Sequence, residues 1–298
     1  KQRRHYVVPP AKDAAGKREP RKLTSSDYNI TEFNWSPDGK AIAFAHQKTS
    51  GANDWTSGDL SVVDVASGKA QALLSSPAAE GDPIYSRDGK WIALTVSDNP
   101  PRWAGGTTIN ILPATGGAPR ALAASFDEQP DLIGWNADGK QLYFSEARGT
   151  TTRIYAINAD TGAITEFNKG DNAYGNITIN RTGTAFGFAM QATDKPAEAY
   201  VSRADGFQPV QVSRANAELA KLPVGKSEVI QWKSRDGLDA LTGAGTAATL
   251  GDSFGPATID VPPESWVAAH EVLRDAVGFS RLVIQRASAS RDVEPGAR

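Results

Sequence analysis

The stretch that decides the fold is Trp35-Ser36-Pro37-Asp38-Gly39-Lys40, which is followed by the apolar run Ala41-Ile42-Ala43-Phe44. Glycine supplies the positive φ that a tight hairpin needs, and an aspartate can accept a hydrogen bond from its own backbone two residues further on. The apolar run has the character of a strand. The stretch therefore predicts two antiparallel strands joined by a tight turn.

Related turns recur three more times along the chain. The copies are Tyr85-Ser86-Arg87-Asp88-Gly89-Lys90, Trp135-Asn136-Ala137-Asp138-Gly139-Lys140 and Ile179-Asn180-Arg181-Thr182-Gly183-Thr184, and their glycines follow one another at intervals of 50, 50 and 44 residues. Each copy is followed by a second, a third and a fourth run with strand character. Four antiparallel strands repeated at such a period are typical of the blades of a β-propeller.

The predicted fold class is all-β, a β-propeller of four-stranded antiparallel blades at residues 30–75, 82–123, 131–168 and 175–213. A β-sandwich would not require one turn to recur in register four times. Propellers close with about 4–8 blades, and Glu19–Thr24 resembles the outer strand of a blade whose earlier strands are missing. We therefore expect four complete blades in an incomplete ring.

The two ends of the chain differ from this repeat. Residues 1–24 carry eight Lys and Arg against Asp13 and Glu19, and we interpret them as an N-terminal arm that includes the remnant of a preceding blade. A basic arm could contact anionic partners, but its prolines favour a solvated linker. The propeller is predicted to occupy residues 25–226.

The C-terminal tail, residues 240–298, has an atypical composition. All 14 Lys, all seven Tyr and all 12 Asn of the chain precede residue 240. The tail is rich in Ala, Gly, Arg, Val and Pro, as a shifted reading frame in GC-rich DNA would be, so we hypothesise that it is a frameshift product. We expect it to be irregular, with at most a helix near 264–277 and no fifth blade.

The composition of the chain excludes several classes of function. A net charge of −2 over 298 residues gives no basic character that would suggest nucleic-acid binding. Without Cys, and with three His, the chain is expected to hold no metal and no cofactor. No apolar run is long enough for a membrane span, and we expect a soluble protein, cytoplasmic or periplasmic.

The pattern Trp-Ser-Pro-Asp-Gly-Lys…Ile-Ala-Phe at residues 35–44 resembles the repeat of TolB-type propellers and of the propeller in prolyl oligopeptidase family serine peptidases, the dipeptidyl and acylaminoacyl peptidases included. Residues 227–239 resemble the crossover from the last blade into the α/β-hydrolase domain of these peptidases. The resemblance covers residues 20–239. It implies a propeller that gates and orients short peptides for a catalytic domain. The alternative is a TolB-like, non-catalytic protein-binding module.

The tail contains one formal match to a catalytic motif. Gly251-Asp252-Ser253-Phe254-Gly255 fits the nucleophile-elbow pattern, and Asp260 and His270 follow in the order of a hydrolase triad. The flanking residues do not predict the required strand and helix, and the gaps between the three residues are too short to span strand-helix-strand units. We therefore predict no catalytic residues, and whether the protein is an enzyme stays open.

Two insertions offer the best candidates for binding residues. They are residues 47–58, with Asp54 and Trp55, and residues 98–106, with Arg102 and Trp103. Both lie between the second and third strands of their blades, so both are expected on the face opposite the Asp-Gly turns. A Trp beside a charged side chain suits the recognition of peptides. The alternative is that each Trp only anchors its loop.

A third set of aromatic residues repeats with the turns themselves. Trp35, Tyr85 and Trp135 end the first predicted strand of their blades at equivalent positions. Large aromatic side chains at a repeated position are expected to pack between neighbouring blades rather than to bind a ligand.

Overall fold

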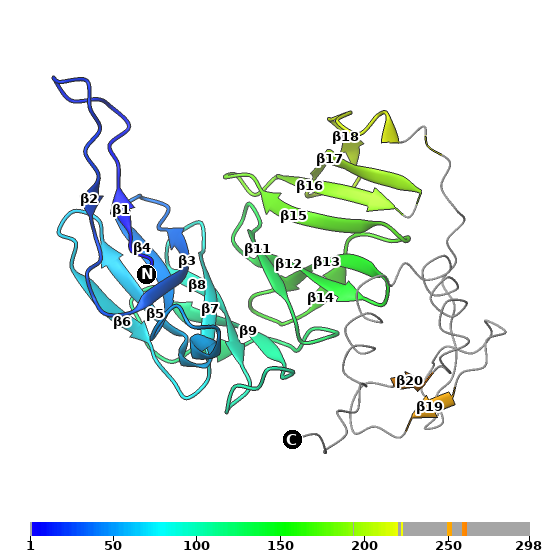
Figure 1. Ribbon diagram of the computed structural model, residues 1–298, viewed down its shortest axis with the longest axis horizontal. Helices are drawn as coiled ribbons and strands as arrows, with labels where there is room; N and C mark the ends of the chain where they lie inside the picture. The colour runs from blue at the N-terminus through cyan, green and yellow to red at the C-terminus, as the bar shows by residue number, and fades with distance from the viewer. Residues whose placement is uncertain (1, 193, 220–221, 223–248, 252–257, 261–298) are drawn as a thin grey trace, which may run out of the picture. The chain divides into compact units, whose positions relative to one another are not determined.

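The structure is a computed structural model that describes residues 2–192, 194–219, 222, 249–251 and 258–260 (Figure 1). The chain divides into two compact units, Lys1–Met190 with Glu198–Ser213, and Gln191–Ala197 with Arg214–Arg298. In the second unit β19 (Thr249–Gly251) pairs antiparallel with β20 (Thr258–Asp260). The predicted crossover at 227–239, the predicted helix at 264–277 and most of the tail lie outside the described residues.

Four antiparallel sheets, each of four strands, follow one another in chain order. Blade 1 contains β3 (Asn29–Trp35), β4 (Ala41–Gln47), β5 (Asp59–Asp64) and β6 (Ala70–Leu74); blade 2 contains β7 (Glu80–Tyr85), β8 (Trp91–Ser97), β9 (Thr107–Pro113) and β10 (Arg120–Ala121). Blade 3 contains β11 (Asp131–Trp135), β12 (Gln141–Arg148), β13 (Thr151–Asn158) and β14 (Ile164–Glu166); blade 4 contains β15 (Ala173–Ile179), β16 (Ala185–Ala192), β17 (Lys195–Arg203) and β18 (Val210–Gln211). The predicted all-β propeller with four-stranded blades is confirmed.

The repeated turns, with Asp-Gly in blades 1 to 3 and Thr182-Gly183 in blade 4, join the first two strands of each blade as the sequence predicts. Gly39, Gly89, Gly139 and Gly183 all adopt φ of 71° or 72°. In the first turn the carboxylate of Asp38 accepts a hydrogen bond from the backbone N–H two residues later, at 3.0 Å. Positive φ at the glycine reverses the chain direction at low steric cost, which is why the turn keeps this residue in all four copies.

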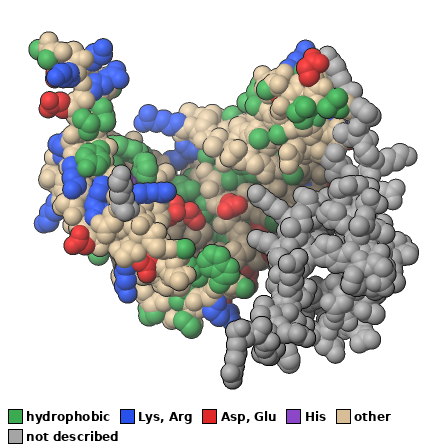
Figure 2. Space-filling model, in the orientation of Figure 1, with side chains coloured by type: hydrophobic (Ala, Val, Ile, Leu, Met, Phe, Trp, Pro, Cys, Tyr) green, Lys and Arg blue, Asp and Glu red, His purple; other side chains and the backbone are tan. Residues whose placement is uncertain are grey.

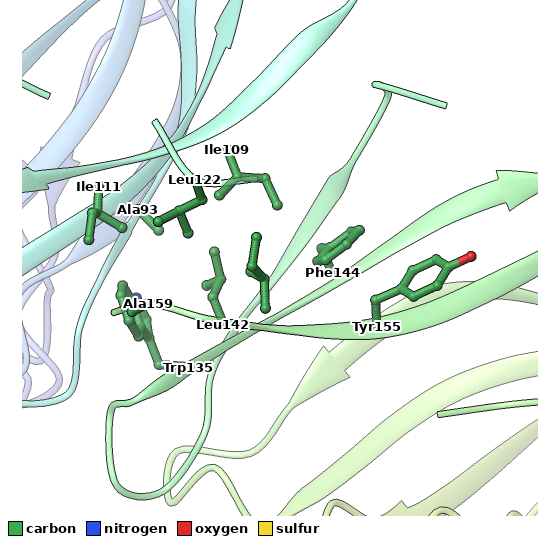
Figure 3. Packing of buried hydrophobic residues seen from close by; sticks show 10 residues of the cluster. Ala93, Ile109, Ile111, Leu122, Trp135, Leu142, Phe144, Tyr155 and Ala159 are labelled. Atoms are coloured by element: carbon green, nitrogen blue, oxygen red, sulfur yellow. The ribbon is translucent and has the colours of Figure 1, made fainter. Parts of the chain in front are cut away.

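Consecutive blades pack through hydrophobic clusters. The cluster between blades 2 and 3 has Ala93, Ile109, Ile111 and Leu122 on one side and side chains of blade 3, Trp135 among them, on the other (Figure 3). Similar clusters join blade 1 to blade 2 and blade 3 to blade 4. None of the clusters in the described part of the chain joins blade 4 to blade 1.

Side-chain size is matched across each junction. The second strand of blade 1 presents Ala43 and Ala45 to the cluster that contains Tyr85 of blade 2. In the same way Ala93 of blade 2 lies in the cluster with Trp135 of blade 3. Where the second strand instead carries the large Tyr143, the equivalent position of the next blade is the smaller Ile179. A small residue therefore meets an aromatic one, and a large residue meets an aliphatic one.

One arginine connects three blades at the Asp-Gly turns. The guanidinium of Arg87, in the turn of blade 2, donates hydrogen bonds to the carbonyls of Trp135, at 2.8 Å, and Asn136, at 2.8 Å, in blade 3. It also donates to the carbonyls of Asn180, at 3.2 Å, and Arg181 in the turn of blade 4. Burial lowers the pKa of Arg87, but the side chain keeps its charge because its ordinary pKa is far above neutrality.

The N-terminal residues form a hairpin that packs on blade 1. Strand β1 (Tyr6–Val7) pairs antiparallel with β2 (Arg21–Lys22), and Leu23, just beyond β2, is buried in a cluster with residues of blade 1. The tip of the hairpin carries exposed basic residues, and Lys and Arg side chains gather there in the space-filling view (Figure 2). Its base is therefore part of the packed structure.

Candidate functional site on the loop face

The strand ends remote from the Asp-Gly turns form a surface that we call the loop face. It carries the connections between the second and third strands, residues 48–58 in blade 1 and 98–106 in blade 2. Both predicted insertions therefore lie on this face. The connection between blades 2 and 3, residues 122–130, also reaches it.

The loop in blade 1 is held by short-range hydrogen bonds. Residues Ala52–Ser57 form a single 3-10 helix, η1, that contains Trp55. The hydroxyl of Ser57 donates to the carbonyl of Asp54 at 2.6 Å and accepts from the backbone N–H of Lys48 at 3.1 Å. These bonds close the base of the loop and fix the position of the half-buried Trp55.

The loop in blade 2 is organised around Asp98. Its carboxylate accepts hydrogen bonds from the guanidinium of Arg102, at 2.5 Å, and from the backbone N–H of Gly106, at 3.3 Å. The pKa of Asp98 is lowered, first by the hydrogen bond from Arg102. A side chain at Gly105 would place its Cβ 2.5 Å from the Asp98 carboxylate, so the loop closes tightly only with glycine there.

The structure brings the two predicted tryptophans together. The ring centroids of Trp55 and Trp103 lie 6.1 Å apart at an interplanar angle of 68°, an edge-to-face arrangement. Trp103 is 85% exposed. A large apolar ring this exposed to water marks a candidate binding surface. Its burial against a ligand would be favourable.

The two predicted charged residues are already occupied within their own loops. The hydroxyl of Thr49 donates to the carboxylate of Asp54, and Arg102 forms an ion pair with Asp98 at 2.5 Å. Both pairs are accessible to water, so a ligand could compete for them at small cost. The structure thus joins Trp55 to Trp103 but does not pair Asp54 with Arg102.

Sequence reasoning missed a row of carboxylates on the first strands of three blades. Glu32 of β3 and Asp82 of β7 precede the turn glycine by the same number of residues, and Asp131 begins β11. The surrounding protein raises the pKa of all three carboxyls, mainly through loss of solvation, and the charge of Asp82 contributes at both Glu32 and Asp131. The equal spacing of Glu32 and Asp82 from the turns was the available signal.

A cavity of about 340 Å³ opens between blades 3 and 4 near this row. Its polar lining includes Asp131 at the start of β11, together with Ser145, Thr152, Tyr174 and Asn176 on neighbouring strands of blades 3 and 4. Within the described ranges, no group of three or more His, Asp or Glu is arranged to hold a metal ion.

The buried carboxylate of Glu146 has a structural role next to this region. It is 2% exposed. One of its oxygens accepts from the hydroxyl of Ser125 at 2.6 Å and from the backbone N–H of Gln129 at 2.9 Å. These bonds tie the connection between blades 2 and 3 to strand β12, which positions residues 122–130 on the loop face.

The formal triad of the tail cannot be placed, since Ser253 and His270 lie outside the described residues. In the part of the chain that the structure does describe, no helix has the length and apolar character needed to cross a membrane.

No family model matches the chain. Among curated proteins it is similar to dipeptidyl-peptidase 5 of Porphyromonas gingivalis, with 26% identity over 153 residues, which are 50% of this chain and 22% of that protein. It is also similar to dipeptidyl-peptidase 5 of Arthroderma otae, with 25% identity over 158 residues, 48% of this chain and 22% of that protein. The match thus spans about a fifth of the length of these relatives.

Solved structures show the same fold. TolB from Acinetobacter baumannii matches with a TM-score of 0.54 and 19% identity, over 76% of this chain and 55% of that one. A puromycin-hydrolyzing peptidase from Mycobacterium tuberculosis matches with a TM-score of 0.53 and 16% identity, over 72% of this chain and 32% of that one.

The fold and these similarities define a TolB-like β-propeller. The curated matches add a similarity to peptidases: about half of this chain is similar to about a fifth of dipeptidyl-peptidase 5, and the same fold occurs in the solved puromycin-hydrolyzing peptidase.

Proposed function

We propose that the chain is the propeller portion of a prolyl-oligopeptidase-like serine peptidase, where it gates and orients short peptides for a catalytic hydrolase domain. The observation that carries the proposal is the similarity to dipeptidyl-peptidase 5, whose name states that it acts on peptides. The short peptides and the hydrolase domain are the proposed partners.

The loop face supplies the chemistry that such a role needs. The exposed ring of Trp103 and the adjoining Trp55 offer an apolar surface against which a peptide side chain can pack. Asp54 and Arg102 lie beside them and could bond a peptide backbone or terminus after exchanging their present partners. We assign substrate contact to these four residues.

Peptide binding by the chain tests the proposal. Di- to hexapeptides and one long unfolded polypeptide are titrated into the protein, and binding is followed by calorimetry and by the NMR signals of the indole N–H groups. We expect saturable binding of the short peptides. Trp103→Ala should weaken it about 10-fold, in the range for a truncated aromatic contact.

Trp91→Ala is the matched control. Trp91 is 42% exposed but begins β8 directly after an Asp-Gly turn, at the opposite end of its strand from the loop face. Its replacement should leave peptide affinity unchanged. Equal losses for the two variants, or no binding of any short peptide, would contradict the proposal. Binding of folded proteins with no binding of short peptides would favour the TolB-like alternative.

A further inference from the structure

We propose that the cavity between blades 3 and 4 binds a primary ammonium group carried on an alkyl chain, a free alkylamine or a lysine side chain, through the carboxylates of Glu146 and Asp131. The cavity lies between β11, β12 and β13 of blade 3 and β15 of blade 4 (Figure 1). The proposal does not depend on the peptidase assignment, because it follows from the residues that line the cavity. The tryptophan pair of the loop face belongs to loops of blades 1 and 2 and is not part of it.

The first observation is a buried carboxylate with one oxygen left free. Glu146 lines the cavity and is 2% exposed. Its Oε1 accepts the hydrogen bonds from Ser125 and Gln129, and neither of these two residues lines the cavity. Its Oε2 is buried without a hydrogen-bond partner in the described structure. A buried carboxylate oxygen is costly to leave without a donor, so Oε2 calls for a donor group from the cavity side.

The second observation is the charge of the cavity lining. Asp131 and Glu146 both line the cavity, whereas no Lys, Arg or His is found among the described residues that do so. The ion pairs formed by described residues include neither of these two carboxylates. The pKa of Asp131 is raised, first by loss of solvation and then by the charges of Asp82 and Glu146. Carboxyl groups that repel one another without a cation between them favour a cationic ligand.

The third observation is the size of the cavity and its apolar walls. Its volume of about 340 Å³ is roughly ten times that of a water molecule and lies at the lower end of the range for small-molecule sites. Leu132, Ile133 and Ile177 line it together with Tyr174, whose side chain is buried. These side chains can cover the methylene groups of a ligand while Glu146 accepts from its ammonium group. An alkylammonium ion therefore uses both the polar and the apolar parts of the lining.

The hydroxyl groups of the lining favour a primary ammonium over a quaternary one. Ser145 and Thr152 line the cavity with Glu146. The hydroxyl of Thr152 donates to the carbonyl of Tyr174 at 3.3 Å, so its oxygen can still accept a hydrogen bond. A primary ammonium has three N–H donors to share between the carboxylate and such hydroxyl oxygens. A quaternary ammonium carries the same charge but has no donor for Oε2.

Butylammonium is the probe, and binding is followed by calorimetry and by the NMR signal of the Gln129 backbone N–H, which donates to Glu146. We expect saturable binding. Both 1-butanol and butyltrimethylammonium should bind at least ~10-fold more weakly, because the first lacks the charge and the second lacks the donors. Nα-acetyl-lysine methylamide, with the norleucine derivative as its uncharged control, distinguishes the two sources of the ammonium. Binding of the lysine derivative assigns the site to a side chain, and binding of butylammonium alone assigns it to a free amine.

Glu146→Gln is the decisive variant. The amide keeps an oxygen for the bonds from Ser125 and Gln129 but replaces the free carboxylate oxygen by a donor, so butylammonium should bind about 10-fold more weakly or worse. Glu80→Gln is the matched control. Glu80 is 3% exposed and its Oε2 is also buried without a partner in the described structure, but it does not line the cavity. Its replacement should leave the affinity for butylammonium unchanged.

Asp131→Asn changes an exposed position and carries the test if Glu146→Gln does not fold. It should weaken butylammonium about 2- to 5-fold, as for a partner open to water. The proposal is overturned if butylammonium does not bind saturably, if 1-butanol binds equally well, if the Glu146 and Glu80 variants behave alike, or if Asp131→Asn has no effect. Tighter binding of Ca²⁺ than of butylammonium would also overturn it, because the carboxylates would then serve a metal ion.

Discussion

Two junctions in this molecule are built from the same repeat but differ in completeness. Between blades 2 and 3 a four-stranded sheet stands on each side, and Trp135 is buried, with its indole N–H donating to the carbonyl of Ile84 at 3.2 Å. In front of blade 1 only the β1–β2 hairpin is present among the described strands, and Trp35 remains exposed. One sequence motif thus has two environments.

The difference shows what the repeat encodes. The turn and the strand after it form in the same way in both places, because glycine and apolar alternation act locally. Burial of the aromatic residue instead depends on a neighbouring second strand. The motif therefore predicts a hairpin from its own residues, whereas the contribution of its Trp to stability is decided by another part of the chain.

The strongest test of the comparison is to remove the two tryptophans in turn. Trp135→Ala should lower the free energy of unfolding by about 3–5 kcal/mol, the range for a buried Trp. Trp35→Ala should cost less than about 1.5 kcal/mol, because much of the ring already faces water. Denaturant unfolding followed by circular dichroism measures both. Equal losses would show that the N-terminal junction is as complete as the interior one.

Replacement of Arg87 tests whether its hydrogen bonds stabilise the contact of blade 2 with blades 3 and 4. Arg87→Met keeps most of the side-chain volume but removes the hydrogen bonds to carbonyls of blades 3 and 4, and should cost about 2–3 kcal/mol. Hydrogen exchange should accelerate at the turn around Gly183 but not in the β1–β2 hairpin. Arg181→Met is the control, because this residue contributes its backbone carbonyl. Faster hydrogen exchange confined to blade 2 would contradict the role assigned to Arg87.

Acidification should weaken the N-terminal junction before the interior ones. Burial lowers the pKa of His5 and His46 from the ordinary value of 6.5. The unfolded chain therefore takes up these protons first, so the stabilisation is present above about pH 6.5 and declines as the pH falls from there towards the lowered values. The protection factors of the β1 and β2 amides, which compare the measured exchange with the intrinsic rate at each pH, should decrease as the pH falls from 7.5 to 5.5.

The interior junction contains neither of these histidines and gives the internal reference. Both ring nitrogens of His5 are buried without a hydrogen-bond partner in the described structure, and the ring contacts Phe33 and Phe44 edge to face. His5→Leu should therefore flatten part of the pH dependence of the hairpin. An unchanged dependence in this variant would exclude His5 as its source.

The smallest effect is expected on the loop face. Arg102→Ala removes an exposed ion pair, so the midpoint of denaturant unfolding should be unchanged within error. The pKa of Asp98 should rise towards its ordinary value, because the Arg102 hydrogen bond is the main cause of its lowering. An NMR titration of the carboxyl measures this. A large loss of stability would show that the loop supports the blades.

Much of the fold could be predicted because the Asp-Gly turns act locally. Gly39 and its equivalents give the hairpins, and their spacing gives the four blades. The environment of Trp35 could not be predicted from the repeat, since exposure depends on strands that the motif does not contain. The burial of Leu23 beside a basic, proline-containing arm could not be predicted for the same reason, because it depends on packing against side chains of blade 1.

Only part of the candidate site could be predicted from the sequence. Topology correctly put Trp55 and Trp103 on one face, because connections between second and third strands share it. It did not reveal that Asp54 and Arg102 bond within their own loops, which depends on loop conformation. Whether these residues contact substrate stays a prediction. The carboxylates of Glu32, Asp82 and Asp131 were missed, because isolated acidic residues on strands resemble solvated charges.

The size matching across the junctions also bears on how the chain avoids misassembly. Repeats this similar can associate in the wrong order while they fold, a known hazard of repeat proteins. If blade 3 packed its Tyr143 side against Tyr85 of blade 2 instead of Ile179 of blade 4, two large rings would meet in a space shaped for one, at a cost of about 1–3 kcal/mol. The large Tyr143 therefore distinguishes the junction of blades 3 and 4 from the other two, and steric exclusion as well as attraction favours the correct neighbour of blade 3.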